Sequence, residues 1–171
     1  DAGFEQGDAV MLSGESAIGR DPREGVKVLN RVAVRIGRSG GAGYGRAALL
    51  EDSRQKTVAS AVALANSLPN SKLIVFTRHG TMAGYVSNLR PEHAPIFAFT
   101  PSVQVYRQLA LCWGTFPLSI DFTEDPNVTI ETAAKHLRTA RLAGPGDNLV
   151  IISDIRAGKT LVDCVQLRQV K

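Results

Sequence analysis

The chain has 171 residues, of which 44% are hydrophobic, and it carries a formal net charge of +4. This length and composition suit one packed domain, or one domain together with part of another. No apolar run reaches the roughly eighteen residues of a membrane span. The basic residues are spread along the chain, without the cluster of Lys, Arg and aromatic side chains that is typical of a nucleic-acid surface. We therefore expect a soluble globular protein with neither a membrane nor a nucleic-acid partner, in which the basic excess favours at most a small phosphorylated ligand.

The two cysteines, Cys112 and Cys164, lie far apart and in apolar surroundings. This setting predicts buried free thiols in place of a disulfide or a metal site. The three histidines also lack metal-ligand spacing, so no metal ligand is predicted. Free thiols fit a reducing compartment, and we expect a cytoplasmic location. Because the chain begins Asp-Ala-Gly, without an initiator Met or a leader segment, we expect it to be cut from a longer one.

Residues 9–12, Ala-Val-Met-Leu, predict a buried strand, and the polar turn Ser-Gly-Glu-Ser follows at 13–16. Residues 21–24, Asp-Pro-Arg-Glu, have the pattern of a helix N-terminus, and apolar residues then recur at helical spacing as far as residue 36. One strand with one amphipathic helix cannot bury its own faces. We therefore expect residues 1–37 to belong to a larger fold.

Residues 38–52 predict a linker. Four glycines fall between positions 40 and 45, a composition typical of flexible connections. The glycines do not form a dinucleotide-binding fingerprint, because Arg46 stands where the last glycine is needed and no strand leads into the segment.

From residue 53 onward the pattern alternates between helix and strand. Helices are predicted over 53–68, from 81 to before Pro91, from Thr100–Pro101 to about 114, and from Asp125–Pro126 to about 143; strands are predicted over 72–77, 95–100, 115–120, 146–155 and 161–170. Helices between strands imply right-handed crossovers and a parallel sheet, whereas the short last connection implies an antiparallel edge strand. Residues 53–171 therefore predict a three-layer α/β/α domain with a mostly parallel five-stranded sheet and an antiparallel last strand.

The first candidate site is the segment Phe-Thr-Arg-His-Gly-Thr-Met-Ala-Gly at 76–84. A strand ends there and a helix begins, so free backbone N–H groups and the positive end of the helix dipole would form a phosphate seat. The residues expected to contribute are Thr77, Arg78, His79, Gly80 and Thr81. The alternative is that a threonine merely caps the helix while His79 lies on the surface.

The second candidate site is Ser-Asp-Ile-Arg-Ala-Gly-Lys-Thr at 153–160, which ends like a nucleotide-binding loop. The match is incomplete, because Ser153 replaces the first glycine and the residues after Thr160 alternate as in a strand. An ordinary hairpin is the favoured interpretation, in which Arg156 and Lys159 help to hold an anion. The alternative interpretation is a nucleotide-hydrolysing enzyme built on this segment. A strand at 161–168 would exclude it.

The third candidate site is the turn after the opening strand, with Ser13 and Glu15. Short polar residues at the carboxyl end of a buried strand are typical of active sites in α/β barrels. The sequence contains no complete catalytic triad, carboxylate pair or metal cage beside them.

The ten residues Asp-Ala-Val-Met-Leu-Ser-Gly-Glu-Ser-Ala at 8–17 resemble the segment that closes the catalytic barrel of the pyruvate kinase family. The segment SNLRPEHAPIFAFTPSVQVYRQLALCWGTFPL at 87–118 is similar to the C-terminal domain of the same family. The resemblance implies that 1–37 is the last strand and helix of a (β/α)8 barrel. It also implies that 53–171 is the C-terminal α/β domain, which carries subunit contacts and, in many members, allosteric control.

The family transfers a phosphoryl group from phosphoenolpyruvate to ADP with Mg²⁺ or Mn²⁺ and K⁺, using groups from earlier barrel strands and a lid domain. The resemblance therefore implies that this chain is catalytically inactive and holds no cofactor. It also implies that Ser13 and Glu15 lie beside the family's active site without acting in a chemical step. It also implies self-association through the C-terminal domain. An alternative is a stand-alone module that binds a small phosphorylated ligand on the same α/β domain.

Family members that bind a sugar phosphate show Thr-x-Ser-Gly-x-(Ser/Thr) after the first strand of this domain. Thr77 and Gly80 match, whereas His79 and Met82 replace the two hydroxyl residues. Backbone N–H groups would then do most of the binding. The usual bisphosphate effector, another phosphorylated effector and no effector all stay open.

Overall fold

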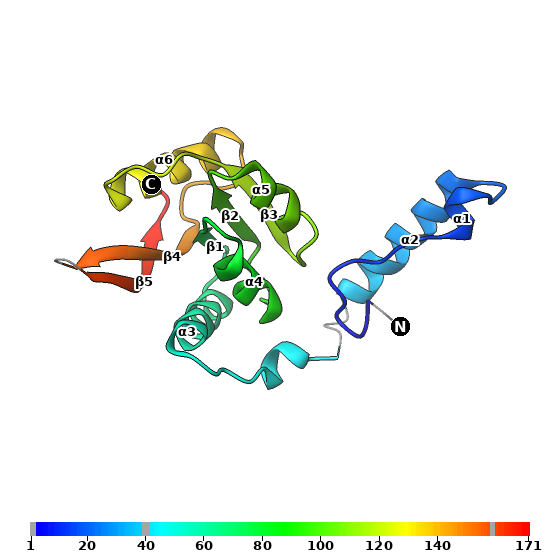
Figure 1. The fold of residues 1–171 in the computed structure, drawn as a ribbon, viewed down its shortest axis with the longest axis horizontal. Coiled ribbons are helices and arrows are strands. Elements are labelled where there is room, and N and C mark those ends of the chain that lie inside the picture. Colours follow the sequence, from blue (N-terminus) through cyan, green and yellow to red (C-terminus); the bar gives the residue numbers. More distant parts are fainter. Residues whose placement is uncertain (1–2, 39–41, 158–159) are drawn as a thin grey trace. The chain divides into compact units, whose positions relative to one another are not determined.

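A computed structural model describes residues 3–38, 42–157 and 160–171, with the side chains of Tyr44, Arg46 and 154–162 outside the description. The chain divides into two compact units, Asp1–Ala47 and Ala48–Lys171, which are drawn in Figure 1. The division falls inside the predicted linker. Within the described residues, no helix is both long and apolar enough to cross a membrane.

Unit 1 contains the predicted amphipathic helix, α2 (Pro22–Gly37), preceded by the single turn α1 (Gly14–Ala17) and followed by the 3-10 turn η1 (Tyr44–Ala47). The N-terminus of α2 is confirmed: the Asp21 carboxylate accepts from the Glu24 backbone N–H at 3.1 Å, and Pro22 occupies the first helical position. The sequence pattern at 21–24 therefore decides where the helix begins.

The predicted strand at 9–12 is wrong for this chain. Residues 9–13 have no regular secondary structure, and Val10 and Met11 are 40% and 87% exposed. A strand is stable only when a neighbouring strand takes up its hydrogen bonds, and the described part of unit 1 contains no other strand. The apolar run alone is therefore not sufficient to form one.

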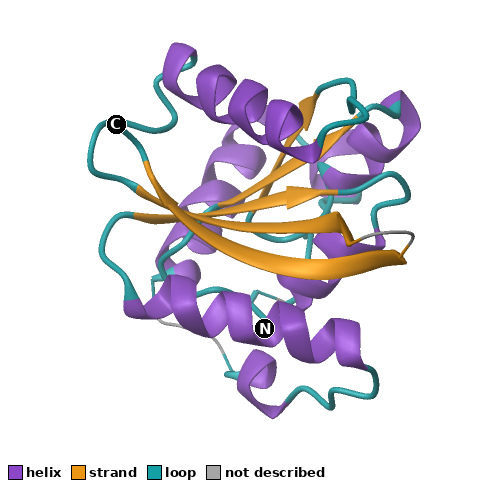
Figure 2. Ribbon diagram, turned by 90° about the vertical axis from the view of Figure 1, so that its left-hand side faces the viewer, coloured by secondary structure: helices purple, strands orange, loops and turns teal. Residues whose placement is uncertain are grey.

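Unit 2 is built on the predicted five-stranded sheet, whose order is β3-β2-β1-β4-β5. The strands, whose twist is visible in Figure 2, are β1 (Ser71–Phe76), β2 (Ile96–Thr100), β3 (Thr115–Ser119), β4 (Asn148–Ala157) and β5 (Thr160–Gln169). The first four are mutually parallel, and β5 is antiparallel to β4. This confirms the predicted mostly parallel sheet with an antiparallel last strand.

Four helices of unit 2 cover the two faces of this sheet: α3 (Ser53–Ser67), α4 (Thr81–Asn88), α5 (Val103–Leu109) and α6 (Pro126–Thr139). The core between α3, α4, α5 and the sheet includes Val58, Val86, Leu109, Leu73 and Ile152. The core between α6 and the opposite face includes Ile130, Leu137, Ile74, Phe99 and Ile151. The predicted three-layer α/β/α architecture is therefore confirmed.

The placement of α6 follows from the strand order. The connections from β1 to β2 and from β2 to β3 run toward one edge of the sheet, whereas the connection from β3 to β4 runs back past two strands. Right-handed crossovers then place α4 and α5 on one face and α6 on the other. Because β1, β2 and β3 are parallel, the loops that follow them lie at a single edge, the carboxyl edge of the sheet.

One predicted helix begins later than the sequence suggested. Thr100 and Pro101 were expected to start it, but α5 begins at Val103, with Ser102 as its N-cap. The Ser102 hydroxyl accepts from the Val105 N–H at 3.3 Å, and the Thr100 hydroxyl accepts from the Ser102 N–H at 3.2 Å. Thr100 stays in β2 because it is fully buried and paired with Ser119.

Candidate functional site

The predicted phosphate seat is the turn between β1 and α4. Thr77 is buried at its start, where its N–H donates to the Phe99 carbonyl at 3.0 Å and continues the pairing of β1 with β2. The Thr77 hydroxyl accepts from the Gly80 N–H at 2.9 Å and closes the turn. Gly80, the N-cap of α4, has a φ of +87°, a left-handed conformation that glycine adopts without strain. The sequence Thr-Arg-His-Gly therefore fixes the backbone through its first and last residues.

The amides at the start of α4 point out of this turn. The Gly84 N–H donates to the Gly80 carbonyl at 2.9 Å, so the N–H groups of Thr81, Met82 and Ala83 precede the intrahelical hydrogen bonds. Gly80 has no side chain with which to cap them. Three amides at the positive end of an eight-residue helix can hold an oxyanion.

Arg78 extends from the same turn toward the loop after β3. Its guanidinium carbon lies 4.9 Å from the centre of the Phe122 ring, a cation–π distance. Phe122 in turn meets Phe76 edge-to-face, with 5.8 Å between ring centres. Arg78 is therefore held at the carboxyl edge by an aromatic contact, beside two further exposed side chains of the turn, His79 and Thr81.

Sequence reasoning missed Phe122, because it lies in an irregular segment with no motif around it. The available signal was topological. The end of β3 reaches the same edge as the end of β1, so a residue just after β3 is close to the turn at 77–80. Such a neighbour is found only after the strand order is known.

The second candidate segment is a hairpin. β4 runs to Ala157, β5 starts at Thr160, and these two residues are paired. A nucleotide-binding loop would need a helix after Thr160. The nucleotide-hydrolysing alternative is therefore wrong, and the hairpin interpretation is confirmed.

The hairpin extends beyond the predicted phosphate seat. Val75 pairs with Ile152, which sets Thr77 level with residue 154. The backbone of Arg156 thus lies two residues, or about 7 Å, further along the sheet. The Arg156 side chain and the whole of Lys159 lie outside the described residues, so their expected contribution stays a prediction.

The third candidate site is the turn at 13–16 in unit 1, whose polar groups hydrogen-bond to one another. The Glu15 carboxylate accepts from the Ser13 N–H at 3.1 Å, and the Ser16 hydroxyl donates to the Ser13 carbonyl at 3.2 Å. Hydrogen bonds from the backbone N–H groups of Glu15 and Ser13 lower the pKa of the Glu15 carboxyl. All three residues are exposed, so the turn presents an ionised carboxylate to solvent. Over the described parts of the chain, no three His, Cys, Asp or Glu side chains group together as metal ligands would.

The fold and the turn after β1 together define an α/β domain with an amide-lined helix start at its carboxyl edge. Residues 55–166 match the family model described as pyruvate kinase, alpha/beta domain. The chain belongs to the pyruvate kinase family.

Curated relatives agree with this assignment. The chain is 34% identical over 160 residues to pyruvate kinase isozyme A, chloroplastic, of Nicotiana tabacum, an alignment that covers 88% of this chain and 27% of the relative. It is 34% identical over 175 residues to the pyruvate kinase of Lactococcus lactis, with coverages of 96% and 33%. Pyruvate kinase 2 of Synechocystis is 34% identical over 152 residues, with coverages of 88% and 25%. The chain thus spans about a quarter to a third of the length of these relatives.

Proposed function

We propose that these 171 residues form a regulatory and assembly region of a pyruvate kinase, which as a whole converts phosphoenolpyruvate and ADP into pyruvate and ATP with Mg²⁺ or Mn²⁺ and K⁺. The observation that carries the proposal is the match of residues 55–166 to the pyruvate kinase alpha/beta domain. The described carboxylates and histidines form no metal-binding group, and Ser13 and Glu15 act in no chemical step. The chain alone should therefore show no turnover of phosphoenolpyruvate and ADP, and a measurable rate above background would contradict the proposal.

The regulatory part of the proposal is a phosphorylated small molecule bound by the turn at 77–83. Its support is the set of three amides at the start of α4, together with Arg78 at the same edge. The turn's buried hydroxyl, Thr77, is already engaged with Gly80. Backbone N–H groups and one guanidinium would therefore supply most of the binding energy.

The test is a calorimetric titration of the full chain with sugar monophosphates, sugar bisphosphates and nucleotides. The variant Arg78→Ala should weaken saturable binding about tenfold, because it removes one charge-assisted hydrogen bond. Arg138→Ala, at an exposed position near the C-terminus of α6, is the matched control and should leave the affinity unchanged. Absence of binding in a folded sample, or equal loss in both variants, would remove the effector site and leave a role in assembly.

The assembly part of the proposal places self-association at the β5 edge of the sheet. The two edges differ: β3 has Pro117 in its middle, which removes a backbone donor, whereas β5 is a ten-residue strand without proline. Proline on an edge strand blocks pairing with a second sheet. If two copies pair through their sheets, β5 is the edge that offers an unbroken row of donors and acceptors.

Leu167 on β5 and Phe116 on β3 provide matched variants, since they are 50% and 54% exposed. Leu167→Lys should shift sedimentation equilibrium toward the monomer, whereas Phe116→Lys should not, because only the first places a charge on the pairing edge. A monomeric wild-type chain, or an equal shift in both variants, would contradict the assignment.

We also propose a reducing compartment, the cytoplasm, for this chain. Neither Cys112 nor Cys164 forms a disulfide bond, which supports a reducing environment. Several relatives bear the word chloroplastic in their names, so localisation of a tagged chain must distinguish the cytoplasm from a plastid.

A further inference from the structure

The basic residues of the chain are concentrated in one helical segment, residues 20–38. Residues 20–38 contain six basic and two acidic side chains, a net charge of +4 that equals the net charge of the whole chain. Five of the six basic residues recur at intervals of four or three residues along α2: Arg23, Lys27, Arg31, Arg35 and Arg38. At 100° per residue they fall within an arc of roughly 120°. We name these five residues the basic stripe of α2.

The basic stripe lies on the side of α2 that is turned away from the rest of unit 1. A Cβ atom on Gly25 would lie 3.6 Å from the Leu12 side chain, and one on Gly3 would lie 3.5 Å from Ile36. The segment before α1 thus packs against the face that contains Gly25 and Ile36. All five members of the basic stripe are exposed.

Local acids neutralise only part of this charge. Glu24 pairs with Lys27 at 3.4 Å and with Arg31 at 3.3 Å. Across the described residues, Arg23, Arg35 and Arg38 have no acidic partner. The negative end of a helix dipole is its C-terminus, so cations near the C-terminus of α2 are each slightly favoured. This dipole effect explains why basic residues are stable near the C-terminus of α2. It does not explain why Arg31, Arg35 and Arg38 fall within eight consecutive positions.

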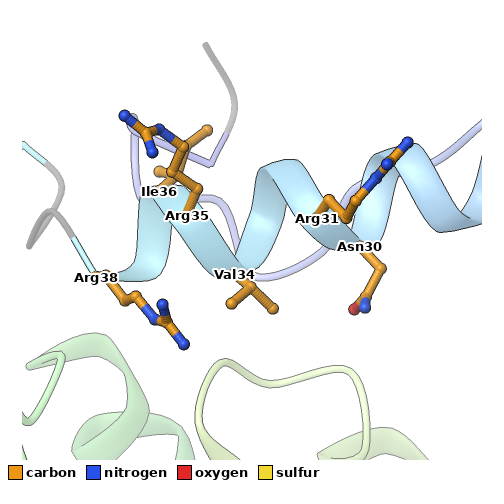
Figure 3. A pocket seen from close by; sticks show the side chains of 6 residues that line it. All are labelled: Asn30, Arg31, Val34, Arg35, Ile36 and Arg38. Carbon is orange, nitrogen blue, oxygen red and sulfur yellow. The ribbon is translucent and has the colours of Figure 1, made fainter.

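A hollow of about 620 Å³ lies along the C-terminal half of α2, and the side chains that line it all belong to α2 and its C-cap residue. Figure 3 shows the side chains that line it: Asn30, Arg31, Val34, Arg35, Ile36 and Arg38. The three guanidinium groups point in different directions, as like charges do. An anion with at least two charges would draw them together.

We propose that Arg31, Arg35 and Arg38 form a binding site for a small molecule with two or more phosphoryl groups. Arginine presents a planar fork of donors that matches phosphate oxygens. From residue 31 to residue 38 the helix rises about 10 Å, so the three long side chains start close enough together to converge on one small anion. α2 also contains no aromatic residue on which a nucleic-acid base could stack. These arginines belong to unit 1, whereas the turn at 77–83 belongs to unit 2.

The experiment is a calorimetric titration of the full chain with pyrophosphate at 0.05 and 0.15 M salt. Arg35→Gln should weaken binding at least tenfold. Arg23→Gln removes the same charge from the same stripe outside the hollow, and should change the affinity less than twofold. Circular dichroism should show equal helix content in both variants, since both side chains are exposed.

Other results would overturn the proposal. Equal weakening by Arg23→Gln and Arg35→Gln would show general attraction to a basic helix, and no saturable binding would show no site. Loss of binding in Arg78→Ala, with Arg35→Gln unaffected, would assign the pyrophosphate to the turn at 77–83 and leave the function proposed for that turn intact. Tighter binding of an oligonucleotide of twenty thymidines, in competition with pyrophosphate, would make the stripe a nucleic-acid surface.

Discussion

Gly80 and Gly84 should respond in opposite ways to replacement by alanine, because their backbone conformations differ. Gly80 has a φ of +87°, and Gly84 lies inside α4 with open space at its Cβ position. A left-handed alanine costs about 1–2 kcal/mol, whereas an alanine inside a helix gains about 0.5–1 kcal/mol over glycine.

Gly80→Ala should therefore lower the free energy of unfolding by about 1 kcal/mol or more, and Gly84→Ala should raise it by about 0.5 kcal/mol. Urea denaturation of the two variants measures both values. If Gly80→Ala is as stable as the wild type, the turn at 77–80 is not as rigid as its hydrogen bonds indicate.

The Asp147 carboxylate contributes to stability through an ion pair with Lys72. This carboxylate accepts from the Lys72 ammonium at 2.6 Å and from the Gly144 N–H at 2.7 Å, and both side chains of the ion pair are mostly buried. These hydrogen bonds, that of Lys72 first, lower the pKa of the Asp147 carboxyl. A lowered pKa in the folded state gives stability that is present above the unfolded value of about 3.9 and is lost as the pH falls.

Asp147→Asn should reduce the free energy of unfolding at pH 7 by about 2 kcal/mol. The difference from the wild type should shrink as the pH falls below about 4, because the wild-type carboxyl then protonates as well. Asp121→Asn, at an exposed position in the loop after β3, should change stability by less than about 0.5 kcal/mol. A pH-independent difference would mean that the amide disrupts packing and not an ion pair.

At the scale of elements, helix starts follow local hydrogen bonds. Asp21, Asp52, Ser102 and Asp125 each accept from a backbone N–H two or three residues on. Three of these starts can be predicted from the sequence. The fourth start, at α5, cannot be assigned from Thr100-Pro101-Ser102 alone, because all three residue types are common at helix starts. The burial of Thr100 in β2 leaves Ser102 as the N-cap.

Ser102→Ala should lower the free energy of unfolding by about 1 kcal/mol through loss of the cap. Ser60→Ala should be neutral or slightly stabilising, since Ser60 is an exposed mid-helix residue that donates back to Lys56. Thermal unfolding followed by circular dichroism distinguishes the two. An equal effect would show that the Ser102 hydroxyl is not the cap in solution.

The helices and strands of unit 2 could be predicted because two independent signals mark each one. The first is the periodicity of its apolar residues, and the second is the glycine, proline or capping residue at its ends. Residues 9–12 have the apolar pattern of a strand without the partner that makes one. The turn at 77–81 was located correctly from its sequence, whereas the position of Phe122 over Arg78 required the strand order. The basic stripe of α2 was missed because charge was counted along the chain and not around the helix.

At the scale of the whole molecule, the two units differ in how much they bury. None of the residues 3–38 is buried, whereas the cores of unit 2 run from Val58 to Val170. Helices without buried residues open easily.

Limited trypsin digestion should therefore cleave at the exposed Arg and Lys residues of 20–38 before it cleaves within unit 2. Mass spectrometry of the early products should show a persistent fragment that contains residues 53–171. Equal protection of both parts would show that α2 is covered in solution, and sedimentation of the same sample would tell whether a second copy covers it.

The strand order also has a consequence for synthesis on the ribosome. The central pair joins Ser71 to Asn148, positions 77 residues apart, so β1 lacks one of its two neighbours until most of the domain has emerged. Distant pairings of this kind slow folding and leave strand edges open in the meantime. Nascent chains that end before β4 should bind holdase chaperones and be degraded, so a premature stop near residue 145 should abolish the accumulation of the domain.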